Sequence, residues 1–181
     1  MTMRAQPLAG AGPAHAGPAR PAGPGARRGL LVTVVVVGTA LLLRLFVVGW
    51  YPVQSDSMAP TVGAGDHVVV DRLGWRLGGP ERGDLVTLVS PEDGTALLKR
   101  VVAVGGDEVR IDDALLVVNG VVADEPYVDH DRIDATYFGP VQVPDGHVFV
   151  LGDNRFGSID SRVFGPVALR DVTGRVVLTL G

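Results

Sequence analysis

The stretch A-L-L-K-R-V-V-A-V, Ala96–Val104, decides how most of this 181-residue chain is interpreted. Its apolar and β-branched residues predict a strand, in which successive side chains point to opposite faces. One face of that strand carries Leu97, Lys99, Val101 and Ala103. Lys99 is the only polar residue on this face. Its amine either reaches water at an edge or loses its hydration, and the sequence leaves both alternatives open.

A lysine that has lost its hydration can act as a base. Burial disfavours the charged amine and lowers its pKa from about 10.4, by up to roughly 3–5 units when burial is complete. The neutral amine then accepts a proton at physiological pH. Lys99 is the single lysine among 16 basic residues, and arginine cannot be deprotonated. Lys99 is therefore a candidate general base, although codon preference would produce the same bias.

Residues 52–181 consist of short valine-rich runs separated by glycine and proline, which predicts a mainly β domain. Asn119–Gly120 stands between two valine pairs and predicts a type I′ hairpin turn. No window shows a sustained helical period, so the many short strands indicate a barrel or a coiled sheet. The predicted strands are His67–Val70, Leu85–Val89, Leu97–Val104, Glu108–Ile111, Leu115–Val118, Val121–Ala123, His147–Leu151 and Val176–Leu180.

The N-terminal part has a different composition. Residues 1–28 contain 18 Ala, Gly or Pro residues and no apolar periodicity, which predicts a disordered tail. Residues 29–51 are apolar except for Arg44 and end in the aromatic pair Trp50 and Tyr51. As a helix, this stretch has a length of roughly 33 Å, enough to cross a bilayer if Arg44 extends to the head groups. We therefore predict a transmembrane anchor.

The charges orient this predicted anchor. The first 50 residues carry five arginines and no acid, whereas residues 51–181 carry 11 basic and 20 acidic side chains, a net charge of −9. The positive-inside rule then places the tail in the cytoplasm and residues 52–181 outside it, in a single-pass protein of the cell membrane. One alternative is a cleaved signal peptide, but no A-x-A site follows the apolar core. A buried core helix or strand is another.

Composition and motifs disfavour several other kinds of site. The absence of cysteine excludes disulfides, cysteine-ligated zinc and a thiol nucleophile. The acidic domain argues against nucleic acid as a partner. The sequence has no H-E-x-x-H and no G-x-S-x-G, and neither a metal nor a cofactor is predicted. A Ser-His-Asp site stays open, although none of the four histidines stands out as its base.

Four of the five serines lie in two short clusters. The first is S-D-S-M-A-P-T (Ser55–Thr61), and the second is G-D-N-R-F-G-S-I-D-S-R (Gly152–Arg162). Ser, Asp, Asn and Pro form turns unaided, so either cluster can be an ordinary turn. The alternative is that one of these serines is a nucleophile paired with Lys99.

Taken together, the motifs resemble the four signature boxes of bacterial type I signal peptidases, the Ser–Lys leader peptidases of peptidase family S26. In chain order they are S-D-S-M-A-P-T, G-D-H-V-V-V, K-R-V-V-A-V-G-G-D and G-D-N-R-F-G-S-I-D-S-R-V-F-G. The resemblance covers residues 44–165 and the apolar stretch before them. It implies a coiled β-sheet or barrel peptidase domain at 52–181, with a small cap insertion at about 107–144, behind one transmembrane helix. The implied activity is cleavage of signal peptides from exported preproteins.

The resemblance also implies roles for individual residues. Ser57 is implied as the nucleophile and Lys99 as its general base, with Ser55 in the oxyanion hole beside the Ser57 N–H. Ser158 is implied to hydrogen-bond the lysine amine and orient it. Other residues are implied to support the site or to line the substrate pockets. The supporting residues are Asp160, Arg162 and the turn Gly152, Asp153 and Asn154, and the pocket residues are Met58, Val62, Leu97 and Leu98.

Three residues, at two places in the chain, depart from the family pattern. Phe156–Gly157 replace polar residues, and Gln54 replaces a proline or glycine beside the nucleophile loop, which leaves the local loop geometry open. The implied partners are preproteins emerging from the export machinery and the lipid bilayer, without nucleic acid and without an obligate oligomer. The alternatives are a self-cleaving repressor on the same fold, a specialised peptidase with few substrates, and an inactive membrane-anchored binding domain.

Overall fold

The computed structural model describes residues 24–130, 133–134 and 136–181, with all side chains except those of residues 24–27 and 43–46. The chain forms two compact units that divide after Ala40, and the strands all belong to the second. Residues 1–23 of the predicted tail and the Arg44 side chain lie outside the described part.

The apolar N-terminal stretch is helical. Helix α1 (Pro24–Val47) begins at a proline, which suits a first helical turn because its missing N–H needs no partner there. The sequence predicts a helix over residues 29–51, so the helix begins and ends earlier than expected. Among the described residues, no helix combines the length and the apolar character that a membrane crossing needs.

The helix ends where the chain enters a sheet. The Val47 carbonyl accepts the N–H of Arg72 at 2.8 Å, and strand β1 (Val48–Pro52) follows at once. Trp50 pairs with Val69 in the neighbouring strand. Two consecutive valines and a glycine are poor helix formers, so strand pairing replaces the last helical turn that the sequence predicts.

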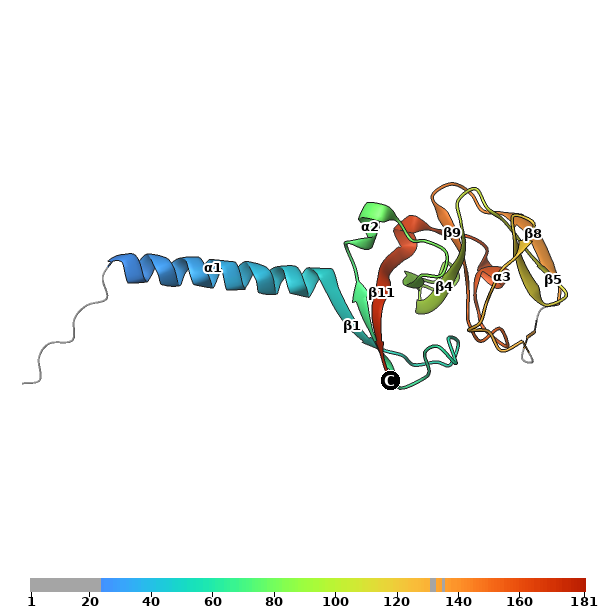
Figure 1. The fold of residues 1–181 in the computed structure, drawn as a ribbon, viewed down its shortest axis with the longest axis horizontal. Helices are drawn as coiled ribbons and strands as arrows, with labels where there is room; N and C mark the ends of the chain where they lie inside the picture. The colour runs from blue at the N-terminus through green and yellow to red at the C-terminus, as the bar shows by residue number, and fades with distance from the viewer. Residues whose placement is uncertain (1–23, 131–132, 135) are drawn as a thin grey trace, which may run out of the picture. The chain divides into compact units, whose positions relative to one another are not determined.

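Seven strands form the main sheet, in the order β1-β2-β11-β3-β4-β9-β10, and every neighbouring pair is antiparallel. Figure 1 shows how strands β11, β4 and β9 follow one another around a curled sheet. This architecture confirms the predicted mainly β class. Besides β1, the strands are β2 (His67–Asp71), β3 (Leu85–Val89), β4 (Ala96–Val104), β9 (His147–Leu151), β10 (Val167–Ala168) and β11 (Val172–Leu180).

A second, four-stranded sheet is built from the stretch in which an insertion is expected. Its order is β7-β6-β5-β8. Asn119 and Gly120 connect β6 to β7 with φ angles of 54° and 80°, which confirms the predicted type I′ turn. Its strands are β5 (Glu108–Asp112), β6 (Leu115–Val118), β7 (Val121–Val122) and β8 (Phe138–Gln142), and the remaining elements are α2 (Trp75–Gly78), α3 (Ser161–Phe164) and the 3-10 turn η1 (Leu169–Asp171).

Strand β4 contributes to two different hydrophobic clusters. Val101 packs with Val86, Val148 and other residues of the main sheet, whereas Ala103 joins Phe149 and the residues of the second sheet. The prediction that Val101 and Ala103 share a face is wrong, because the β4–β9 register shifts between them. The extra residue of this bulge reverses the alternation. Because of this bulge, β4 contributes side chains to both hydrophobic clusters.

Candidate active site

Lys99 and Ser57 lie in direct contact. The Lys99 Nζ donates a hydrogen bond to the Ser57 Oγ at 2.9 Å. The lysine is 2% exposed, so its amine is desolvated and does not reach water at an edge. Burial lowers the pKa of Lys99 from 10.5 to about 8, assisted by the positive charge of Arg162 and opposed by the carboxylate of Asp160. The contact therefore joins a hydroxyl to an amine that is readily neutral.

The loop that carries Ser57 is hydrogen-bonded to Asn154, which is distant in the sequence. The N–H of Asn154 donates to the Ser57 carbonyl at 3.1 Å, and the Asn154 side-chain amide donates to the carbonyl of Asp56, also at 3.1 Å. Ser55 lies on the same loop, and its hydroxyl is 3.3 Å from the Ser57 Oγ. The structure thus brings Ser55, Ser57 and Asn154 together, as the sequence predicts.

Gly152 makes this close approach possible. A Cβ at this position would lie 2.2 Å from the Ser158 Oγ and 2.6 Å from the Ser57 carbonyl oxygen. Only glycine fits there without displacing the backbone of the nucleophile loop. The Ser158 hydroxyl is buried and has no hydrogen-bond partner among the described residues, so the expected bond to the Lys99 amine is not formed in this structure. The orienting role of Ser158 stays a prediction.

Asp160 and Arg162 support the same segment. Asp160 is fully buried and binds the Arg162 guanidinium through both carboxylate oxygens, each at 2.9 Å. Its Oδ2 also accepts the N–H of Gly152 at 3.1 Å. Because Asp160 is occupied by Arg162, it does not form an ion pair with Lys99. Asp160 and Arg162 therefore hold the turn, and among the residues that the structure describes no carboxylate forms an ion pair with the lysine amine.

Sequence reasoning missed a second buried ion pair. The Arg100 guanidinium binds the Asp153 carboxylate through two hydrogen bonds, at 2.7 and 2.6 Å, and Thr61 also donates to Asp153. Arg100 is adjacent to Lys99 on β4, so this contact lies on the other face of the strand. A charged residue inside an apolar strand needs a partner, and that rule was the available signal.

Ser57 and Lys99 lie in the wall of a cavity of about 450 Å³. Leu97 and Leu98 line it, as the sequence predicts, together with Gln54. Met58 and Val62 do not. The backbones of these two residues pair with each other, and both side chains are fully buried in a cluster with Val68 and Val70. Their side chains lie in the core in this structure, and their role in binding substrate stays a prediction.

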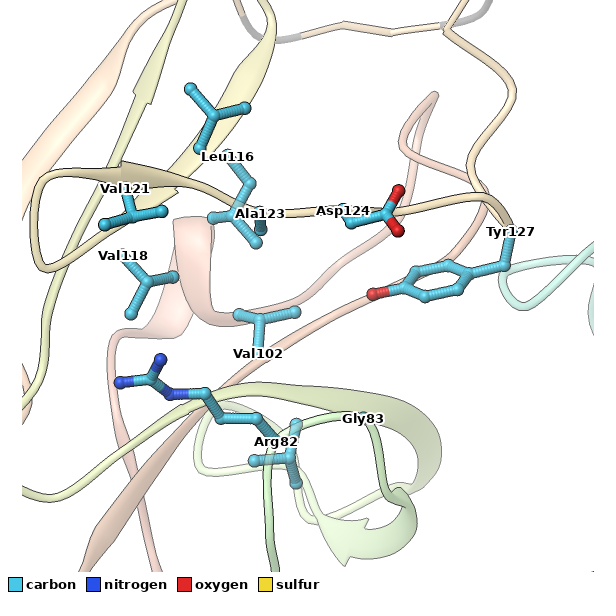
Figure 2. A pocket seen from close by; sticks show the side chains of 11 residues that line it. Arg82, Gly83, Val102, Leu116, Val118, Val121, Ala123, Asp124 and Tyr127 are labelled. Carbon is cyan, nitrogen blue, oxygen red and sulfur yellow. The ribbon is translucent and has the colours of Figure 1, made fainter.

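A second cavity of about 280 Å³ lies elsewhere in the domain. Figure 2 shows it between strand β4 and the β6–β7 hairpin, with Arg82, Val102, Val121 and Tyr127 among the side chains that line it. Neither Ser57 nor Lys99 lines this cavity. Within the described residues, no group of three or more His, Asp or Glu side chains is arranged to hold a metal ion. The candidate active site is therefore the cavity at Ser57.

The chain is similar to known proteins over most of its length. The family model described as "Signal peptidase, peptidase S26" matches residues 26–180. A probable signal peptidase I-2 of Synechocystis sp. is 37% identical over 152 residues, which cover 80% of this chain and 67% of the relative. The signal peptidase I S of Bacillus subtilis is 38% identical over 138 residues, or 71% of this chain and 74% of the relative.

A solved structure is also similar. The crystal structure of a signal peptidase I from Enterococcus faecalis has a TM-score of 0.47 and 33% sequence identity, covering 53% of this chain and 95% of that chain. A serine hydroxyl in contact with a buried amine is the arrangement of a serine peptidase that uses a lysine base. Since the family model covers most of the chain, this protein belongs to the signal peptidase family, peptidase S26.

Proposed function

We propose that this protein is a membrane-bound serine endopeptidase that cleaves N-terminal signal peptides from exported preproteins. The observation that carries the proposal is the 2.9 Å contact between the Lys99 Nζ and the Ser57 Oγ in the wall of a cavity. The relatives named signal peptidase I support the substrate class. An inactive relative on the same fold is not favoured, because both members of the Ser–Lys pair are present and in contact.

In the proposed mechanism Lys99 is the general base. The neutral amine takes the proton of the Ser57 hydroxyl, and the Ser57 oxygen attacks the scissile carbonyl carbon. The resulting oxyanion is bound by the Ser55 hydroxyl and the Ser57 N–H, where one such donor is worth about 3–4 kcal/mol. The protonated Lys99 then gives its proton to the leaving amine as the C–N bond breaks. Water, deprotonated by Lys99, finally releases the acyl group from Ser57.

The cavity presents an apolar surface next to the proposed position of the scissile bond. Its walls near Ser57 include Leu97, Leu98 and Val68, and its volume is about 450 Å³. Alanine-sized residues fit such a surface without burying an unpaired polar group. This supports the preference for A-x-A cleavage sites that the family resemblance implies.

We place the protein in the cell membrane as a single-pass protein with a cytoplasmic N-terminus. The proposal rests on the apolar part of α1, Leu30–Val47, and on the arginines that precede it. Ser57 follows Val47, the end of α1, by ten positions, so the nucleophile lies within roughly 33 Å of that end along the chain. A cleavage site emerging from the bilayer can then reach it. The proposed partners are the preprotein and the bilayer, and no obligate oligomer is predicted.

Cleavage of a model preprotein in detergent tests the function. Wild-type protein should cleave it, and Ser57→Ala and Lys99→Arg should each abolish cleavage. Ser90→Ala is the matched control, because Ser90 lies in the turn after β3 and does not line the cavity, and its hydroxyl bonds the N–H of Glu92 and the Asp93 side chain. Full activity of Ser57→Ala or Lys99→Arg would contradict the proposed pair. Protease digestion of residues 52–181 from outside intact cells tests the topology.

A further inference from the structure

Three side chains outside the proposed mechanism form a buried polar cluster, the Glu125 cluster of Glu125, Tyr127 and Arg155. The side chains of Glu125 and Arg155 are each 2% exposed and form an ion pair. The Tyr127 hydroxyl donates to the same carboxylate oxygen of Glu125 at 3.2 Å. Burial and the Glu125 carboxylate raise the pKa of the Tyr127 phenol, so it stays protonated and keeps donating.

The Glu125 cluster restrains the turn Gly152–Arg155, and this turn is hydrogen-bonded to the loop that carries Ser57. The Arg155 Nε donates to the Gly152 carbonyl at 3.0 Å, which closes the turn from Gly152 to Arg155. Inside that turn, Asn154 donates to the carbonyls of Ser57 and Asp56. Glu125 neutralises the charge of Arg155 and fixes its side chain. Two hydrogen bonds of Arg155, the backbone of the turn and the hydrogen bonds of Asn154 therefore connect Glu125 to the backbone of Ser57.

A second contact joins the cluster to the strand of the lysine. The Tyr127 ring lies against the Arg100 guanidinium, with 3.8 Å from the Arg100 Cζ to the ring centre. Figure 2 shows Tyr127 along the wall of the second cavity, beside Val102 of β4. Arg100 in turn binds Asp153 of the same turn. The cluster thus restrains the turn through Arg155 and through Arg100, which follows Lys99 in β4.

We propose that Glu125 is a positioning residue for Ser57, which acts through Arg155 and the turn Gly152–Arg155 and does not touch the substrate. The inference rests on the proposed function, since it assigns Ser57 as the group being positioned. Glu125 lies between β7 and β8, in the stretch that forms the second sheet. The second sheet would then have a catalytic purpose, which is to supply the residue that fixes the nucleophile loop.

The test compares Glu125→Gln with a matched glutamate on the full chain in detergent. Glu125→Gln keeps the side-chain shape and removes the charge that Arg155 needs. We expect kcat to fall by about 10- to 100-fold with KM within about twofold of wild type, because a small misplacement of a reacting group costs rate. Glu125→Asp should recover part of the loss. Glu108→Gln removes an exposed glutamate that also pairs with an arginine, and it should leave kcat unchanged.

The outcomes separate positioning from plain stability. Kinetics are measured below the unfolding temperature of each variant, with the fold checked by circular dichroism. If folded Glu125→Gln keeps wild-type kcat and only its unfolding temperature falls, or if only KM rises, the positioning role is wrong. If Glu125→Gln does not fold, Tyr127→Phe, which removes one hydrogen bond to Glu125, decides the question by the same kcat criterion. Undiminished cleavage by Ser57→Ala would instead overturn the proposed function itself.

Discussion

Arg100 and Asp153 form a two-point ion pair on the face of β4 opposite Lys99. The pair has a consequence for the lysine, because it occupies one of the two carboxylates whose charge raises the Lys99 pKa. Arg162 occupies the other, Asp160. Each of these two carboxylates is thus paired with an arginine, so burial has the larger effect on the pKa of Lys99. Burial therefore lowers the pKa of the Lys99 amine, against the weaker opposing effect of the two paired carboxylates.

The first prediction concerns pH. If neutral Lys99 is the base, kcat/KM should rise about tenfold per pH unit below pH 8 and level off above it, following the pKa of about 8. The measurement is kcat/KM on a peptide or preprotein substrate from pH 6 to 10, since this ratio reports the free enzyme. A profile that keeps rising toward pH 10.5, or one that is flat, would show that Lys99 is not the titrating base.

The second prediction concerns the stability cost of Lys99. The folded pKa of about 8 lies below the unfolded value of 10.5, so the unfolded chain binds more protons between these values and the stability rises with pH across this range. Below pH 8 the penalty is fully present. Lys99→Met should therefore raise the free energy of unfolding by up to about 3 kcal/mol at pH 6.5.

This stabilisation should shrink as the pH approaches 10.5. Urea denaturation of both proteins at pH 6.5 and pH 10 provides the measurement. Lys99→Met should also be inactive, which separates stability from function in one variant. A stability difference that is the same at both pH values would mean that the buried amine is not responsible for it.

The third prediction concerns Gly152. Gly152→Ala places a methyl group 2.6 Å from the Ser57 carbonyl oxygen, which belongs to the backbone and cannot rotate away. The nucleophile loop must shift, so kcat should fall by about 10²-fold. Gly78→Ala is the matched control, because nothing lies within 4 Å of its added carbon. Equal activity of the two variants would mean that the loop accommodates the methyl group without moving Ser57.

The fourth prediction concerns Asp153. Asp153→Asn leaves the Arg100 guanidinium buried without a counter-charge, which should lower the free energy of unfolding by about 3–5 kcal/mol. Asp112→Asn removes a carboxylate from an exposed pair with Arg110, and its effect should stay below about 1 kcal/mol. Urea denaturation of both variants compares them directly. Similar small effects at the two sites would contradict the structural importance of the buried pair.

The fifth prediction concerns Ser55. Its hydroxyl lies 3.3 Å from the Ser57 Oγ, and Ser55→Ala should lower kcat by a factor on the order of 10²–10³ while KM changes little. Steady-state kinetics on a model preprotein measure this, with Ser90→Ala as the control. An unchanged kcat would remove Ser55 from the oxyanion hole.

Much of the fold can be predicted from local patterns. Strands β3, β6 and β9 have the predicted bounds. Each is a short run of apolar and β-branched residues with turn residues on both sides, and those turns fix where the strand begins and ends. The missed strand β8 contains Gly139 and Pro140, which argue against a strand, yet it lies at a sheet edge where proline is tolerated. The bulge in β4 was also missed, since it depends on the partner strand β9.

The sequence by itself determined the mainly β class and identified Lys99 as a candidate base, because alternation, turn residues and one isolated lysine are local features. Ser57 was identified by the resemblance of its motif to the family's signature boxes. The tertiary structure alone decided that Lys99 touches Ser57 and that Met58 turns inward. It also decided that Glu125 pairs with Arg155, 30 residues away. Burial, pKa and ion pairing depend on which distant segments pack together, and no local pattern records that packing.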